Sequence, residues 1–181
     1  MSKKSRNIEI KAIASDFTRQ KRIAESISET PPELFRQEDY YFKIDKGRLK
    51  LRVLSINKGE LIYYERPDDT GPKLSSYQIY NTNSPNKLIE VMKSSYGIRN
   101  IVRKERHLFI YNRTRIHMDI VDSLGEFVEL EVVLGRSDSI KKGEEEAEFL
   151  INRLGISKKD LIASSYIDLI EEQESKSKIS I

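Results

Sequence analysis

Charged and aliphatic residues alternate strictly along several stretches of the chain. The clearest run is Arg48-Leu49-Lys50-Leu51-Arg52, and the stretches 9–11, 115–120 and 129–132 follow the same period of two. In a β-strand this period places the charges on one face and the aliphatic side chains on the other. Like charges side by side repel one another, so a face with three basic residues is better suited to a bound anion than to solvent alone. The pattern therefore predicts strands whose charged face holds a compact polyanion.

The order of the periodic segments predicts a strand, a helix, a run of strands, a second helix, more strands and C-terminal helices. Strands are expected at about 7–13, 36–44, 47–56, 60–66, 74–81, 99–111, 114–122 and 126–134. Helices are expected from an N-cap at Ser15 to about Glu29, from Ser84-Pro85 to Tyr96, from Glu144 to Leu154, and after a capping-box-like start at Ser157–Asp160. We expect a flexible N-terminus at 1–6, a single domain at 7–170 and a flexible, patternless tail at 171–181.

Eight strands in mostly sequential order favour an antiparallel sheet that closes on itself. The predicted fold class is therefore α+β: an eight-stranded antiparallel β-barrel or tunnel with a polar, charged interior and helices packed outside. The aliphatic faces then point outward under the helices. This inverts the usual small barrel, and its interior charges need a ligand, water or opposite charges beside them, because unpaired buried charges are very costly.

The composition limits the classes of partner and site that the protein can have. The net charge of +3 is too modest to indicate a nucleic-acid-coating protein. The absence of cysteine excludes disulfides, zinc–thiolate sites and cysteine nucleophiles. No apolar run reaches membrane-spanning length, and the first residues lack the apolar core of a signal peptide. We therefore expect a cytoplasmic protein that binds neither nucleic acid nor membrane.

The charged residues expected to face inward indicate what the anion is. The acids are Glu9, Asp119, Glu129 and Glu131, and the bases are Lys11, Arg48, Lys50, Arg52, Arg66, Lys73, Lys104, Arg106 and Arg115. Bases exceed acids by five, and a triphosphate carries roughly four negative charges, which Arg and Lys clamp through its oxygens. The carboxylates suit one or two Mg²⁺ or Mn²⁺ ions, which prefer oxygen ligands and bridge phosphates. Together the residues predict a metal–triphosphate site.

Seven segments, in order, resemble those of the CYTH superfamily, the triphosphate tunnel metalloenzymes. They are Asn7–Lys11, Gln37–Phe42, Gly47–Arg52, Tyr64–Asp68, Val102–Arg106, Leu124–Glu131 and Ser165–Leu169. The last of them resembles the closing segment of the class IV adenylyl cyclase-like branch. The resemblance spans residues 7–170 and selects Lys104 and Arg106 as inward-facing, which alternation alone leaves open. It implies an eight-stranded tunnel that binds ATP, thiamine triphosphate or inorganic triphosphate with a divalent metal, and it suggests a homodimer.

The resemblance also gives the candidate residues roles. Glu9, Glu129 and Glu131 are the expected metal ligands, and Asp119 either binds a second metal or orients Arg115. The nine bases are expected to bind the triphosphate, Lys73 least securely because it lies in a loop-like segment. Lys11, Arg115 and Asp119 are the expected catalytic residues. For Lys11, a general base and a charged phosphate ligand are both open, with the second slightly favoured.

Four further residues qualify this interpretation. Asn7 stands where the signature has its first glutamate; its amide oxygen can bind Mg²⁺, but it contributes no charge and cannot act as a base. His117 is expected to point inward, more as a structural residue than as a catalyst. Tyr77 is expected either to face a nucleotide or, slightly favoured, to cap the tunnel, and Tyr41 is expected to pack.

Two reactions suit such a site. The class IV-like segments favour an adenylyl cyclase, which converts ATP to cyclic AMP and pyrophosphate. Inorganic triphosphate hydrolysis is the alternative, because it requires nothing beyond the phosphate clamp, and thiamine triphosphate hydrolysis is less favoured since the chain has no Trp to stack on the thiamine rings. A non-catalytic nucleotide- or polyphosphate-binding module is the third hypothesis, which Asn7 would support.

Overall fold

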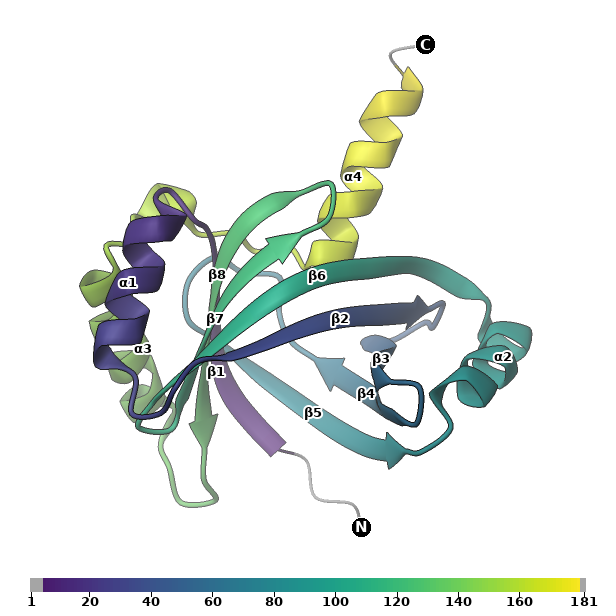
Figure 1. The fold of residues 1–181 in the computed structure, drawn as a ribbon, viewed down its shortest axis with the longest axis horizontal. Coiled ribbons are helices and arrows are strands. Elements are labelled where there is room, and N and C mark those ends of the chain that lie inside the picture. Colours follow the sequence, from purple (N-terminus) through teal and green to yellow (C-terminus); the bar gives the residue numbers. More distant parts are fainter. Residues whose placement is uncertain (1–4, 180–181) are drawn as a thin grey trace.

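In the computed structural model, which describes residues 5–179, eight antiparallel strands close into a barrel with helices on its outside (Figure 1). The strands are β1 (Ser5–Ile13), β2 (Glu33–Phe42), β3 (Arg48–Ser55), β4 (Lys58–Glu65), β5 (Lys73–Thr82), β6 (Ile98–Tyr111), β7 (Thr114–Val121) and β8 (Gly125–Leu134). Around the barrel they follow the order β1-β5-β4-β3-β2-β6-β7-β8. The predicted fold class is thus confirmed.

Two helices cover one side of the barrel. α1 (Phe17–Ile27) and α3 (Ile140–Leu154) lie beside β1, β7 and β8 (Figure 1). The aliphatic faces of these strands are buried beneath them, and Ile8, Ile10 and Leu130 are fully inaccessible to solvent. α3 approaches β1 so closely that a Cβ at Gly143 would lie 2.7 Å from Ile8. The aliphatic half of the alternation therefore builds the core outside the barrel, as the sequence predicted.

The opposite side of the barrel carries a smaller core. α2 (Pro85–Tyr96) packs on β2, β3 and β4, and its Met92 joins the buried Phe42 and Leu51 (Figure 1). Pro85 begins α2, and Gly97 ends it at a φ of 74°, a value that favours glycine. Both ends agree with the sequence prediction.

The C-terminal helix differs from its prediction. Ser157 does form a capping box with Asp160, but it begins only a 3₁₀ turn, Lys158–Asp160. α4 (Tyr166–Ile179) begins later, its first turns pack beside β6, and its second half projects away from the barrel (Figure 1). Regular helix thus continues through residues 171–179, where we predicted a patternless tail; residues 180–181 lie outside the described part of the chain.

Other element ends shift by a few residues. Asp16, not Ser15, caps α1, because its Oδ1 accepts a hydrogen bond from the Arg19 amide at 3.0 Å. α3 begins at Ile140, four residues before the prediction, with Ser139 as its cap. β1 already includes residues 5 and 6 of the expected flexible N-terminus, and residues 1–4 are outside the described range. Within residues 5–179, no helix combines the length and the apolar character needed to cross a membrane.

Candidate active site in the barrel

The barrel encloses a cavity of about 390 Å³, a size typical of small-molecule sites. Its lining, within the described residues 5–179, includes seven basic side chains: Lys11, Lys50, Arg52, Arg66, Lys104, Arg106 and Arg115. Four carboxylates also line it: Glu9, Glu60, Glu129 and Glu131. The basic residues come from β1, β3, β6, β7 and the position just after β4, segments far apart in sequence. The charged half of the alternation therefore converges on one interior space.

On the β2–β3 side, a buried aspartate positions two of these bases. Asp39 is 1 % exposed, and its carboxylate accepts hydrogen bonds from Lys50 Nζ at 2.7 Å and Arg52 Nε at 2.9 Å. Burial alone would raise the pKa of Asp39, but the charges of Arg52 and Lys50 hold it well below its usual range. We refer to these three residues as the Asp39 cluster. The cluster fixes two cations at the cavity wall.

On the β6–β7 side, Asp119 holds a second pair of bases. Asp119 is fully buried and accepts two hydrogen bonds from Arg106, each 2.6 Å, one from Lys104 Nζ at 3.3 Å and one from the Tyr166 hydroxyl at 2.8 Å. Burial, reinforced by Arg106, lowers the pKa of Lys104 to about 7 even though Asp119 opposes the shift. We call Asp119, Lys104, Arg106 and Tyr166 the Asp119 cluster. Near neutral pH this cluster offers an amine able to gain or lose a proton.

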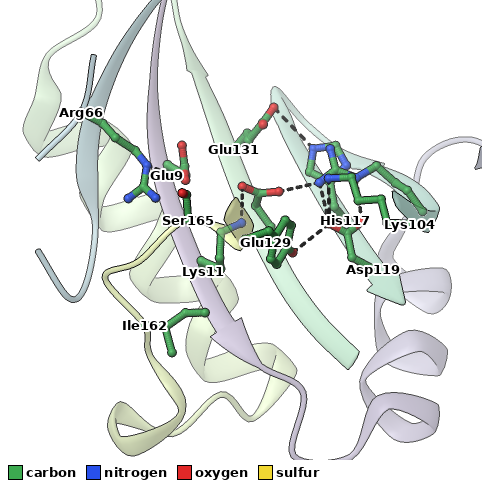
Figure 2. Close-up of polar contacts among 12 residues, drawn as sticks. Glu9, Lys11, Arg66, Lys104, His117, Asp119, Glu129, Glu131, Ile162 and Ser165 are labelled. Carbon is green, nitrogen blue, oxygen red and sulfur yellow. Dashed lines mark hydrogen bonds and ion pairs between the residues drawn. The ribbon is translucent and has the colours of Figure 1, made fainter. Parts of the chain in front are cut away.

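Three carboxylates meet between β1 and β8. Glu9 and Glu131 are directly opposite each other in the β1–β8 register, and Glu129 is opposite Lys11. Glu129 accepts a hydrogen bond from Lys11 Nζ at 2.7 Å (Figure 2). It accepts another from Arg106 at 2.5 Å. Burial raises the pKa of Glu9, and the neighbouring Glu129 raises it further. Like charges opposed across a strand pair are destabilising, so this arrangement favours a cation between them.

The chemistry of this group fits a hard divalent metal. Glu9, Glu129 and Glu131 supply oxygen ligands, and the buried Asn7 Oδ1, two residues before Glu9 on the same face of β1, has no hydrogen-bond partner. Within residues 5–179, no three or more His, Cys, Asp or Glu side chains already surround a point that could hold a metal. Each carboxylate is instead paired with a base, Glu9 with Arg66 at 3.4 Å, so metal binding requires these pairs to open.

Three of the predicted residues lie outside the cavity lining. Arg48 pairs with Asp68 at 2.9 Å and with Asp168 of α4 at 2.8 Å. Lys73 donates to backbone carbonyls, including those of Asp69 at 2.8 Å and Ala163 at 3.1 Å, and burial lowers its pKa to about 8. Asp119 lies behind the wall and bonds the Asp119 cluster rather than Arg115, which pairs with Glu131 at 3.1 Å.

Other predicted residues do face the cavity. His117 and Tyr77 both line it, as does Tyr41, for which the sequence suggested packing. His117 is 4 % exposed, and burial together with the charge of Arg106 lowers its pKa. Its Nε2 lies 3.4 Å from Glu131 Oε2. A neutral imidazole beside the carboxylates is therefore expected at neutral pH.

The sequence reasoning missed several lining or supporting residues. Asp39 and Gln37 share the inward parity of β2, and the buried Gln37 Oε1 has no hydrogen-bond partner. Tyr166 lies over Lys11, whose Nζ is 3.8 Å from the ring centroid. The signal for Asp39 and Gln37 was present, since both fall two residues apart in a segment that carried the family resemblance. Tyr166 also falls in such a segment, Ser165–Leu169, but its contact with the cavity depends on tertiary structure, which the pattern along one strand does not contain.

Comparison with known proteins defines the class. The CYTH domain profile matches residues 5–166, so the chain belongs to the CYTH family. A search of curated proteins gave no match.

Solved structures share the fold. The PH1012 protein of Pyrococcus horikoshii OT3 is similar with a TM-score of 0.80 and 23 % identity, covering 90 % of this chain and 98 % of its own. A Vibrio parahaemolyticus protein assigned provisionally as an adenylate cyclase gives a TM-score of 0.72 at 14 % identity, with 91 % and 97 % covered. HpAC1 from Hippeastrum, a proposed adenylyl cyclase that reveals a dominant triphosphatase activity, gives 0.61 at 12 % identity, with 92 % and 96 % covered. At these identities the similarity shows the fold alone.

Proposed function

We propose that this protein is a metal-dependent enzyme that binds a triphosphate compound in the barrel cavity and cleaves one of its phosphoanhydride bonds. The observation that carries the proposal is the convergence of seven basic side chains, among the described residues, on one cavity that also holds Glu9, Glu129 and Glu131. Arg and Lys clamp phosphate oxygens, and fixed positive charge stabilises the charge that develops on a leaving phosphate. Family membership supports the same class of reaction.

Different residues of the cavity have different roles in this proposal: some bind phosphate and others bind the metal. Arg52, Arg106 and Lys50 are held by buried aspartates, so they are positioned before the ligand arrives. Lys11 donates to Glu129 and lies against the Tyr166 ring, contacts that suit a phosphate ligand better than a general base. Glu9, Glu129 and Glu131 would hold Mg²⁺ or Mn²⁺, which would neutralise phosphate charge when bound.

We propose cyclisation of ATP as the first candidate reaction. The ribose 3′-oxygen would attack the α-phosphorus, the α–β phosphoanhydride bond would break, and pyrophosphate would leave. The proton of the 3′-hydroxyl would pass to water, and the fixed basic side chains of the cavity would stabilise the charge on the departing pyrophosphate. The segment that begins with Ser165 and Tyr166, both of which line the cavity, is the one that resembles the class IV cyclases.

Hydrolysis of the terminal phosphoanhydride is the second candidate. It uses the same basic residues and requires only a water in place of the ribose hydroxyl. The triphosphatase activity of HpAC1, which shares this fold, supports hydrolysis as a candidate reaction. The two reactions differ in the bond that breaks, so the products separate them.

Product analysis tests the proposal. Purified protein is incubated with ATP or with inorganic triphosphate, each with Mg²⁺ or Mn²⁺. Cyclic AMP with pyrophosphate identifies a cyclase, and orthophosphate identifies a hydrolase. Tight binding without any product in either metal would instead indicate a binding module, and absence of both binding and product would contradict the proposal.

A matched pair of variants tests the metal ligands. Glu131→Gln removes a carboxylate from the cavity, whereas Glu126→Gln changes an exposed residue on the same strand, β8. We expect Glu131→Gln to lower metal-dependent turnover by about 100-fold or more and Glu126→Gln to leave it unchanged. Glu131 is the better choice than Glu129, because Glu129 also neutralises the buried Lys11 and Arg106. Equal turnover in both variants would remove the metal assignment.

A further inference from the structure

The carboxylate of Glu129 is occupied by two bases that the proposed function assigns to phosphate. Its Oε1 accepts a hydrogen bond from Lys11 Nζ at 2.7 Å (Figure 2). Its Oε2 accepts another from Arg106 at 2.5 Å. All three side chains are at most 9 % exposed, so a base that leaves Glu129 stays buried and needs another anion beside it. A metal ion therefore competes with both bases for this carboxylate.

Arg66 and Arg115 occupy the other two candidate metal ligands. Glu9 Oε1 lies 3.4 Å from Arg66 Nε, and the Nη1 of Arg66 donates to the Ala163 carbonyl at 2.9 Å. The Nη2 of Arg66 is buried and finds no hydrogen-bond partner within residues 5–179, so it can donate to a ligand. Glu131 pairs with Arg115 at 3.1 Å, and 43 % of the Arg115 side chain is exposed, so this base can turn toward water. Of the three carboxylates, Glu131 is thus the easiest to free.

The charge of the cavity also disfavours a metal ion by itself. Among the described residues, seven bases line the cavity, against four lining carboxylates and the two buried aspartates of the Asp39 and Asp119 clusters, which leaves one excess positive charge. A divalent cation would add two further positive charges to a site that is shielded from water, where like charges repel strongly. A triphosphate, with roughly four negative charges, would reverse the sign of the site. A bound anion therefore makes the cavity attractive to a cation.

We propose that the anion builds the metal site: phosphate oxygens draw the bases away from Glu9 and Glu129, and the freed carboxylates then bind the metal ion. The proposal rests on the proposed function and adds an order of binding to it. The free protein binds the anion well and the metal poorly. Because coupling between two sites is reciprocal, the metal then strengthens anion binding by the same factor as the anion strengthens metal binding.

Two titrations without turnover test this order. Inorganic triphosphate is titrated calorimetrically into the protein in EDTA. Mn²⁺ is titrated separately, in the absence of EDTA and of any phosphate, while its electron paramagnetic resonance signal reports the free ion. Lys11→Gln removes one base from Glu129. Lys50→Gln is the matched control, because it removes the same charge from the same cavity but from a lysine that pairs with Asp39.

We expect the wild-type protein to bind triphosphate in EDTA and to bind Mn²⁺ alone only weakly. Lys11→Gln should bind Mn²⁺ on the order of tenfold more tightly, the effect of removing one charge-assisted hydrogen bond that competes with the metal. Lys50→Gln should keep the wild-type affinity for Mn²⁺. Arg115→Gln is a second variant, on an exposed side chain, that frees Glu131; because exposed ion pairs are weak, its gain should be about twofold.

Three results would overturn the inference and leave the proposed function intact. The first is equal Mn²⁺ affinity in the wild type, Lys11→Gln and Arg115→Gln. The second is an equal gain in Lys11→Gln and Lys50→Gln, because net charge alone would then explain it. The third is binding of triphosphate only when Mn²⁺ is present, since the metal would then bind no later than the anion. Failure to bind triphosphate both in EDTA and with Mn²⁺ would contradict the proposed function itself.

Discussion

The Asp39 and Asp119 clusters lie on adjacent strand pairs of the barrel wall, β3–β2 and β6–β7, and hold their bases in the same way but with different access to water. Each places a buried carboxylate behind two bases that face the ligand. The side chains of Lys50 and Arg52 are 12 % and 16 % exposed, whereas those of Lys104 and Arg106 are only 3 % and 4 % exposed. Desolvation is therefore stronger around Asp119, and it is there that an amine pKa falls to about 7. The difference suggests that the Asp39 cluster mainly binds phosphate, while the Asp119 cluster can also exchange a proton.

The largest expected difference between the two clusters is in the free energy of unfolding that is lost when the carboxylate of each is replaced. Asp119→Asn leaves Lys104 and Arg106 with less compensation in a dry site, so the free energy of unfolding should fall by about 3–5 kcal/mol. Asp39→Asn should cost less, about 1–2 kcal/mol, because Lys50 and Arg52 can reach water in the cavity. Urea unfolding of both variants measures this, and equal losses would show that the two clusters do not differ in desolvation.

Removing one base from the wetter cluster should affect binding more than folding. Arg52→Gln should weaken inorganic triphosphate binding by roughly 30-fold, the effect of one charge-assisted contact, while changing stability less than Asp119→Asn. Arg36→Gln is its control, since Arg36 lies on the outer face with 90 % of its side chain exposed. Titration calorimetry gives both affinities. If Arg52→Gln bound as tightly as Arg36→Gln, the Asp39 cluster would not belong to the phosphate clamp.

The less exposed Asp119 cluster should make the affinity for triphosphate depend on pH. Because the pKa of Lys104 is lowered to about 7, its amine is mostly neutral above that pH in the free protein, whereas a bound triphosphate favours the ammonium. Binding above pH 7 then takes up a proton, and affinity should fall by up to about tenfold per pH unit between pH 7 and 9. Lys104→Arg stays charged across this range and should lose the dependence. The same pH profile in both proteins would exclude Lys104 as its source.

The smallest expected effect on stability comes from removing the tyrosine hydroxyl that donates a hydrogen bond to Asp119, a contact that the Asp39 cluster lacks. Tyr166→Phe removes the 2.8 Å hydrogen bond to Asp119 and should lower the unfolding free energy by about 1 kcal/mol. Tyr41→Phe is the comparison beside the Asp39 cluster, where the hydroxyl lies 3.5 Å from that of Tyr64 and should matter less. Thermal unfolding of both variants measures the difference, and a larger loss in Tyr41→Phe would contradict it.

Much of the fold could be predicted because the barrel rests on local periodicity. Alternation of charged and aliphatic residues is a property of each strand by itself, so it indicated both the strands and their inner faces. The ends of α4 could not be predicted in this way. Its last turns carry polar residues of good helix propensity but no apolar period, and Arg99 on β6 binds Asp168 and Glu171 from outside the helix.

The sequence predicted the residues that line the cavity better than it predicted which charged residues bond other segments instead. Parity placed Lys50, Arg52 and Glu129 in the cavity, and they line it. Parity also included Arg48, yet this residue begins β3 and is drawn to Asp168, a partner 120 positions away. Which inward charges face the cavity and which hold other segments is decided by such distant contacts, which a pattern along one strand does not contain.

The ring of Tyr166 packs over the amines of Lys11 and Lys104, and all three residues are almost fully buried. A ligand cannot pass this point unless Tyr166 and the segment before it move aside. An enzyme that had to move them in each cycle would have its turnover paced by that motion as well as by bond breaking.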